Sequence, residues 1–212
     1  ESLSIDDLYL TRAQRQRLAE QVHPLLVTRG PPGTHDLPLA HAIFDAIAAG
    51  EPVALSRFDK LSDEREPRER WTQVPGRLDL LVFEGWFLGT PAQPDDALVT
   101  PLNDLERQAD PDGVWRHWCN TALANGYTAL WQRCHRLWFL QPPDFSVVPR
   151  WRWQQEQAMQ AAAPGRTGMS RAQLDRFIQF YERVSRQALN TLPDLADHVV
   201  PLDGHRQVVG QR

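Results

Sequence analysis

The sequence has few cysteines, no long apolar run and no excess of basic charge. Its two cysteines, Cys119 and Cys134, form no Cys-x-x-Cys pair and stand near no His pair with zinc-ligand spacing, so we interpret both as buried apolar residues. No stretch approaches the roughly 18 apolar residues of a membrane span, and no charged-then-apolar leader opens the sequence. The net charge of −4 offers no general attraction to nucleic acid. We therefore expect a cytoplasmic protein that binds neither nucleic acid nor membrane, in an oligomeric state that the sequence does not indicate.

Two catalytic patterns are also missing. The histidines show no His-Glu-x-x-His or comparable spacing, which disfavours a catalytic zinc enzyme, and the absence of a Gly-x-Ser-x-Gly elbow disfavours a hydrolase of that class. The composition, with 42% hydrophobic and 24% charged residues, is that of a globular chain. At 212 residues the chain fits one domain, so we expect residues 1–212 to form a single α/β domain.

Strand-like segments alternate with helical ones, which predicts an α/β fold with a parallel sheet flanked by helices on both faces. Apolar runs over Leu78–Phe83 and Leu137–Leu140 predict two buried strands. Ser170-Arg-Ala-Gln173 is a capping box that predicts a helix start. The segment Glu1–Tyr9 is expected to be a strand that ends at once in a polar turn, and the other expected strands are Val53–Asp59 and His198–Leu202. A short helix is expected within Thr11–Val27, stopping near His23-Pro24, and the other expected helices are Asp36–Ala49, Gly113–Arg136, Ser146–Ala163 and Ser170–Leu192.

Acidic residues follow two of these strands, where sheets of this class bind ligands. Asp6 and Asp7 come after the first strand, and either can cap the next helix or accept a hydrogen bond from a substrate hydroxyl and take its proton during phosphoryl transfer. Glu84 ends the apolar run of Leu78–Phe83. It can contact Mg²⁺ through a metal-bound water, or hold a neighbouring loop as a structural acid.

Basic residues in the loop Arg57–Arg65 are candidates for binding an anionic substrate. Lys60 and Arg65 stand close to Asp59 and Asp63, so the loop is either a solvated surface of paired charges or a binding loop. A small carboxylate substrate needs a fork such as the Arg65 guanidinium.

A second basic segment predicts a lid over residues 146–170. Arg150 and Arg152 begin its helix, and Gly165 and Gly168 are candidate hinges. A lid that closes over transferring phosphates needs cations that arrive late and exclude water. The alternative is an exposed basic helix with tryptophans packed beneath it.

Six segments, taken in order, form a recognisable set: Ser4-Ile-Asp-Asp-Leu-Tyr-Leu-Thr11, Thr28-Arg-Gly-Pro-Pro-Gly-Thr-His-Asp36, Arg57-Phe-Asp-Lys60, Phe83-Glu-Gly-Trp-Phe-Leu-Gly89, Trp151-Arg-Trp-Gln-Gln-Glu156 and Pro164-Gly-Arg-Thr-Gly-Met-Ser170. This set resembles the D-glycerate 3-kinase family, relatives of uridine kinase, phosphoribulokinase and pantothenate kinase among the P-loop kinases. The resemblance implies transfer of a phosphoryl group from ATP to glycerate, giving 3-phosphoglycerate, with Mg²⁺.

The resemblance also implies residue roles. By likeness to uridine kinase Asp6 is the catalytic base, and Glu84 occupies the Walker B position. The residues assigned to the substrate are Asp7, Tyr9, His35, Asp36, Lys60 and Arg65, and Arg150 and Arg152 match the lid arginines.

The family's phosphate-binding loop has no counterpart in these residues. Family members carry Gly-x-x-x-x-Gly-Lys-Ser/Thr upstream of the Asp-Asp strand, and no such run occurs here. That loop supplies the principal ATP contacts, so we expect a stretch with the first strand, the P-loop and the first helix of a three-layer kinase sandwich to precede residue 1. Two alternatives stay open: a kinase for another small alcohol, such as a nucleoside or a pantothenate-like compound, and a noncatalytic regulatory domain.

Overall fold

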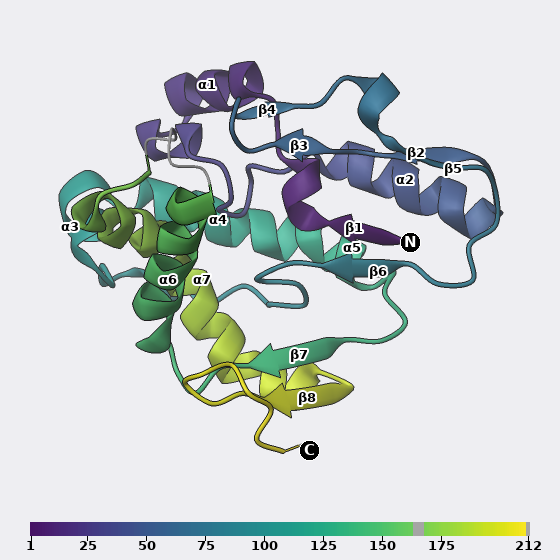
Figure 1. Cartoon of the computed structure of the whole chain (residues 1–212). Helices are drawn as coiled ribbons and strands as arrows, with labels where there is room; N and C mark the ends of the chain where they lie inside the picture. Colours follow the sequence, from purple (N-terminus) through teal and green to yellow (C-terminus); the bar gives the residue numbers. More distant parts are fainter. Residues whose placement is uncertain (163–167, 211–212) are drawn as a thin grey trace. The chain divides into compact units, whose positions relative to one another are not determined.

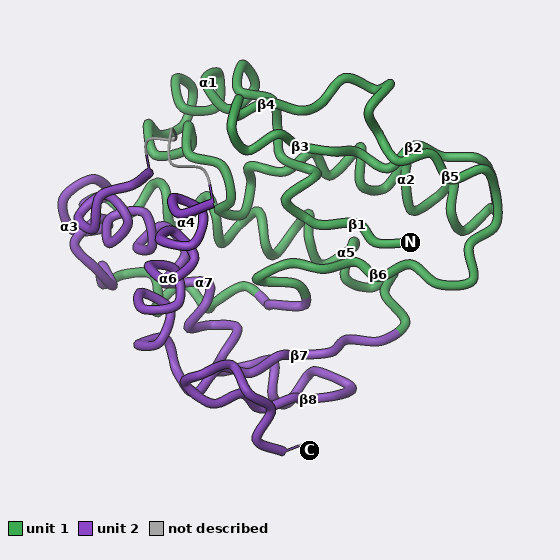
Figure 2. Tube along the Cα trace, in the orientation of Figure 1, with its two compact units in different colours: residues 1–88, 92–99, 112–135 green, residues 89–91, 100–111, 136–212 purple. Residues whose placement is uncertain are grey.

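The structure, a computed structural model, describes residues 1–162 and 168–210. The chain divides into two compact units, drawn in green and purple in Figure 2. Unit 1 comprises Glu1–Leu88, Ala92–Val99 and Asp112–His135, and unit 2 comprises Gly89–Pro91, Thr100–Pro111 and Arg136–Arg212. Organisation as a single domain stays a prediction.

Unit 1 contains one parallel strand pair and two antiparallel pairs. Strand β1 (Ser2–Ser4) lies parallel to β6 (Val82–Glu84), with Ser4 opposite Glu84 (Figure 1). Strands β2 (Val53–Leu55) and β5 (Thr72–Val74) pair in the antiparallel sense, as do β3 (Phe58–Asp59) and β4 (Glu64–Arg65). The expected Val53–Asp59 strand is therefore two short strands, and the charged loop after it is a hairpin.

Helices α1 and α2 of unit 1 each begin at a side chain that caps the helix. Helix α1 (Arg12–Gln21) begins at a Thr11 capping box, so the alternative that Asp6 or Asp7 caps it is wrong. Helix α2 (Leu37–Ala49) begins at Asp36 and ends at Gly50, which has the left-handed φ of 69° that favours glycine. The expected Gly113–Arg136 helix is α4 (Val114–Ala122), a π-helical turn (Leu123–Tyr127) and α5 (Thr128–Trp131). Short 3₁₀ turns cover Ile5–Leu8, Pro24–Val27, Arg68–Arg70 and Asp95–Leu98.

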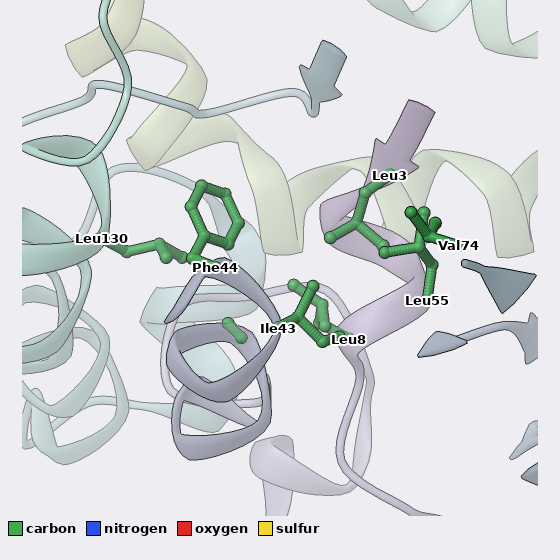
Figure 3. Close-up of a cluster of buried hydrophobic side chains, with 8 residues drawn as sticks. Leu3, Leu8, Ile43, Phe44, Leu55, Val74 and Leu130 are labelled. Carbon is green, nitrogen blue, oxygen red and sulfur yellow. The ribbon is translucent and has the colours of Figure 1, made fainter. Parts of the chain in front are cut away.

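A hydrophobic core anchors the start of the chain (Figure 3). Leu3 and Leu8, both fully buried, stand on either side of the Asp6-Asp7 pair. Burying each leucine stabilises the fold by about 1.5–3 kcal/mol, so the backbone that carries the two acids is fixed from both sides. The buried residues packed with them are Ala40, Ile43, Phe44, Leu55, Val74 and Leu130.

In its described residues, unit 2 combines a parallel strand pair with three helices. Strand β7 (Trp138–Gln141) lies parallel to β8 (His198–Pro201). Helices α6 (Val147–Ala162) and α7 (Arg171–Leu195) enclose a small core of Phe145, Leu174 and Ile178. Helix α3 (Asp104–Ala109) contributes Glu106, whose buried carboxylate pairs with Arg183 of α7 at 2.6 Å.

Two strands expected to be buried are largely exposed. In and before β6 the exposed fractions are 68% for Leu80 and 50% for Val82, and in β7 they are 63% for Trp138 and 60% for Leu140. Within the described residues each strand pairs with one neighbour, so its other edge is unpaired. Exposed Leu80 and Val82 alternate with the partly buried Leu81 and Phe83, so one face of β6 and of the chain before it is uncovered. The run Leu137–Leu140 nearly coincides with β7, whereas of Leu78–Phe83 only Val82 and Phe83 lie in β6, and the predicted burial is wrong for both strands. None of the described helices combines the length and apolar character needed to cross a membrane.

Helix α7 begins at the Ser170 capping box, which confirms the helix start predicted from the sequence. The capping box also leads to a prediction about stability. Ser170 Oγ accepts from the Gln173 backbone at 3.3 Å, and Gln173 Oε1 accepts from the Ser170 backbone at 2.8 Å. Ser170→Ala is expected to lower the free energy of unfolding by about 1 kcal/mol, because it leaves a helix N–H unpaired. Urea unfolding measures the change. Ser185→Ala, inside the same helix, is the control, and an equal loss in both variants would contradict a capping role.

Candidate active site

Two acids emerge from neighbouring strands at the same end. Because β1 and β6 are parallel and Ser4 lies opposite Glu84, Asp6 follows β1 at the edge where Glu84 ends β6. The chain after β6 passes close to the chain after β1: a Cβ on Gly85 would lie 2.5 Å from Ile5 Cγ2. Glycine at position 85 therefore permits this approach. The carboxyl end of the β1–β6 pair is the candidate site.

Asp6 is held by two donors from different parts of the sequence. Its Oδ1 accepts a hydrogen bond from the Tyr9 hydroxyl at 2.5 Å, and its Oδ2 accepts one from Lys60 Nζ at 2.7 Å. Lys60 is the single lysine in the 212 residues. Burial raises the pKa of Asp6, but the hydrogen bonds from Lys60 and Tyr9 and the lysine charge together lower it below the ordinary value. The carboxylate is therefore ionised at neutral pH.

Asp7 holds the hairpin that carries Lys60. Its Oδ1 accepts from the Phe58 backbone N–H at 3.0 Å, and its Oδ2 accepts from Arg57 Nη1 at 2.8 Å. The backbone at the start of β3 is thereby tied to the turn that follows β1. Substrate contact by Asp7 stays a prediction.

Arg65 retains unused donors in the same region. Its Nη2 donates to Asp36 Oδ2 and to the Tyr9 carbonyl, each at 2.9 Å, while Asp36 also caps α2 through the Leu39 N–H. Arg65 Nε is buried and has no partner among the described residues. The guanidinium is thus oriented by the protein and still has donors for a ligand carboxylate.

His35 lies in an aromatic cluster beside Tyr9. The ring centroids of Tyr9 and His35 are 5.0 Å apart, and those of His35 and Phe87 are 5.6 Å apart. Burial lowers the pKa of His35 to about 3, against a smaller opposing effect of Asp6. The imidazole is therefore neutral at physiological pH. Its Nδ1 is bonded to the Tyr127 hydroxyl at 2.6 Å.

The sequence does not single out Tyr127, because the Gly113–Arg136 segment predicts one continuous helix. The available signal was Gly126, a residue that weakens a helix interior. A Cβ on Gly126 would lie 2.5 Å from Leu37 Cδ1, so glycine is needed where this helix passes the start of α2.

The sequence does not single out Arg15 either. Its side chain is buried and donates to the carbonyls of Leu10, Val27 and Asp63, and it pairs with the Asp63 carboxylate at 2.9 Å. Asp63, which also pairs with Arg29, has a φ of 57° in the turn between Lys60 and Arg65. The buried Arg15 side chain thus fixes the turn of the β3–β4 hairpin. No local pattern marks it, because an arginine in an amphipathic helix is expected on the exposed face.

The candidate lid arginines belong to unit 2. Arg150 Nη2 donates to the Gly204 carbonyl at 2.5 Å, and Arg152 Nη1 donates to Gln155 Oε1 at 2.6 Å. Gly168 packs against α6, where a Cβ would lie 2.5 Å from Glu156 Oε1. Gly165, the other predicted hinge, lies outside the described residues. The lid function stays a prediction.

A metal ion would depend on few protein ligands at this site. Among residues 1–162 and 168–210 no group of three or more His, Cys, Asp or Glu side chains is arranged to hold a metal. Mg²⁺ in phosphotransferases is usually bound by one or two carboxylates together with substrate phosphates and water. The exposed carboxylate of Glu84, which has no hydrogen bond or ion pair in the described structure, fits a contact through metal-bound water.

The amino-acid sequence is similar to those of proteins named as kinases. The chain is 30% identical over 187 residues to the uncharacterized kinase mug58 of Schizosaccharomyces pombe, covering 84% of this chain and 66% of that protein. It is 30% identical over 203 residues to the chloroplastic D-glycerate 3-kinase of Arabidopsis thaliana, covering 90% of this chain and 41% of that one. No protein-family model matches the chain.

A solved structure gives the same relationship. The D-glycerate 3-kinase of Cryptococcus neoformans superposes with a TM-score of 0.80 at 26% identity, covering 100% of this chain and 79% of that one. The fold and the parallel strands ending in acids define the α/β class of P-loop kinases. Within that class, the chain belongs to the D-glycerate 3-kinase family. It spans less than two thirds of the length of the first two relatives.

Proposed function

We propose that this protein transfers the terminal phosphoryl group of ATP to D-glycerate, giving 3-phosphoglycerate and ADP. The observation that carries the proposal is the parallel register of β1 and β6, which brings Asp6 and Glu84 out at the same edge. Arg65, which is bonded to Tyr9 and Asp36 and still has an unpaired Nε–H, supports a carboxylate substrate. The relatives named D-glycerate 3-kinase support the choice of glycerate among small alcohols.

In this proposal Asp6 is the catalytic base. Its carboxylate accepts a hydrogen bond from the 3-hydroxyl of glycerate and takes the proton as that oxygen bonds to phosphorus. Both carboxylate oxygens are already hydrogen-bonded, but each has a second acceptor direction. The lowered pKa of Asp6 suits a late proton transfer, since in phosphoryl transfer the hydroxyl becomes acidic as the bond to phosphorus forms.

The remaining substrate contacts come from the elements around Asp6. Arg65 would hold the glycerate carboxylate, with Asp36 and Tyr9 keeping the guanidinium in place. Lys60 would contribute positive charge beside the reacting hydroxyl, and His35 a neutral hydrogen-bonding group. Asp7 would act by holding the β3–β4 hairpin.

The phosphate side needs cations. Glu84 would contact Mg²⁺ through a metal-bound water. Mg²⁺ would neutralise part of the negative charge on the phosphates. Arg150 and Arg152 would close over the phosphates as lid residues. Their present hydrogen bonds, to Gly204 and Gln155, would then be exchanged for bonds to phosphate.

We further propose a cytoplasmic protein whose ligands are ATP and a small-molecule substrate, with no nucleic-acid partner. The net charge of −4 supports the last point. The Arabidopsis relative, by its name, is chloroplastic. Fractionation of the source cells tests the location.

The function is tested by measuring ATP consumption by the full-length protein with D-glycerate, L-glycerate, uridine and pantothenate. D-glycerate is expected to be preferred over uridine by at least about 100-fold in kcat/KM, because uridine has no carboxylate and leaves the Arg65 donors unpaired. Product analysis should yield 3-phosphoglycerate. A preference for uridine or pantothenate would contradict the substrate, and no turnover with any of the four would contradict the kinase activity.

A further inference from the structure

The hydroxyl group of Tyr127 joins the helix of residues 114–131 to the loop before α2. Tyr127 is fully buried, and burial raises its pKa far above the ordinary value, so the hydroxyl keeps its proton. Its oxygen accepts a hydrogen bond from the Gly33 backbone N–H at 2.9 Å. The same oxygen lies 2.6 Å from His35 Nδ1.

The direction of the second hydrogen bond follows from the available acceptors. Within the described part of the chain, Nδ1 of His35 is the one acceptor bonded to the Tyr127 hydroxyl, so the hydroxyl donates its proton there. An accepting Nδ1 carries no hydrogen. Because His35 is neutral, its single ring proton is on Nε2.

The resulting Nε2–H is a buried donor without an acceptor. His35 is 5% exposed, and its Nε2 has no hydrogen-bond partner among the described residues. Native structures rarely leave a buried donor unpaired, because desolvation of the group is then uncompensated. The ring is tilted by 38° against that of Tyr9, whose hydroxyl is bonded to Asp6. The unpaired donor therefore belongs to a ring that neighbours Tyr9, the residue that hydrogen-bonds the proposed base Asp6.

We propose that Tyr127 is a positioning residue that holds His35 in the Nε2–H tautomer, so that Nε2–H donates a hydrogen bond to an oxygen atom of the substrate. This inference rests on the proposed function, because it is the substrate that supplies the acceptor. In the other tautomer Nε2 of His35 would present a lone pair, which repels a carboxylate oxygen and can only accept a hydrogen bond from a substrate hydroxyl. The Tyr127 hydroxyl thus selects a donor for an oxygen-rich substrate without touching it.

The π-helical turn supplies a second, independent reason to assign Tyr127 a functional role. Single π turns within α-helices occur frequently at functional sites, because they shift the side chains that follow. Here the turn Leu123–Tyr127 ends at the tyrosine itself, and Gly126 allows close contact with Leu37 at the start of α2.

The test is Tyr127→Phe in the full-length protein, which removes the hydroxyl and keeps the ring. Nitrogen-15 NMR of labelled histidine should give a bare Nδ1 and a protonated Nε2 in the wild type, and a mixture of tautomers or protonation at Nδ1 in the variant. The KM for D-glycerate should rise about tenfold, the effect of one hydrogen bond, while kcat and the KM for ATP change less than about threefold.

Thr34→Val is the matched control. It removes a fully buried hydroxyl from the same loop, where Thr34 bonds Gly30 and Pro31 and not His35. The control should leave the tautomer and the glycerate KM unchanged. An unchanged tautomer in Tyr127→Phe, or equal KM increases in both variants, would overturn the positioning role. If the wild type fails to phosphorylate glycerate, the proposed function falls, whereas the tautomer measurement needs no substrate and still decides the role of Tyr127.

Discussion

Replacing Asp6 by Asn is expected to lower kcat by about 100-fold or more, with ATP binding little changed. The amide has the size of the carboxylate but cannot take the proton of the glycerate hydroxyl. The substitution also removes the negative charge that pairs with Lys60 Nζ. Steady-state kinetics with glycerate, together with nucleotide binding by calorimetry, separate the chemical step from the binding of ATP.

Asp79→Asn is the control for the Asp6 variant. Asp79 is exposed and makes no hydrogen bond or ion pair in the described structure, so the same chemical change there should leave kcat unaltered. Near-wild-type turnover in Asp6→Asn would remove Asp6 from the role of base.

The pH dependence of the wild type provides a second check on Asp6. Its pKa lies below the ordinary value of 3.8, so the carboxylate stays ionised as the pH falls towards that value and loses its charge only below it. An acid limb with an apparent pKa of about 6 to 7 in kcat/KM would instead indicate another base.

Replacing Arg65 by Ala is expected to raise the KM for glycerate about tenfold to 100-fold and to leave the KM for ATP nearly unchanged. The variant loses a charge-assisted fork for the substrate carboxylate, and such bonds are about twice as strong as neutral ones. The ratio of kcat/KM for glycerate to that for glycerol is the sharper measurement, since glycerol lacks the carboxylate. This ratio should fall by a similar factor.

Two variants separate substrate contact from a structural effect of Arg65. Arg17→Ala removes an exposed arginine of α1 that forms no hydrogen bond or ion pair in the described structure, and it should behave as wild type. Arg65→Lys keeps the charge but not the fork, so it should recover part of the preference for glycerate. Equal increases in both KM values, with an unchanged glycerate-to-glycerol ratio, would contradict a carboxylate contact.

The sequence predicted features that neighbouring residues specify. The Ser170 box, the stop of α2 at Gly50 and the strands that end before Asp6 and at Glu84 are set by residues a few positions apart. Their hydrogen-bonding and conformational preferences act within one or two turns of chain, so a single sequence reveals them.

Strand burial could not be predicted in the same way. The apolar run of Leu78–Phe83 has the composition of a covered strand, yet Leu80 and Val82 are exposed. Burial depends on which elements cover a strand, and composition describes only the strand itself.

The sequence by itself determined the α/β class, the family and the acids at the ends of β1 and β6, because each follows from a local pattern or an ordered set of motifs. Only the tertiary structure decided which groups meet. Lys60 bonds Asp6, 54 residues away in the sequence, and Tyr127 bonds His35, 92 residues away. Such contacts depend on hairpin register and on a π turn, which no pattern of a few residues encodes. The charge on Asp6 and the tautomer of His35 are therefore properties of the folded chain.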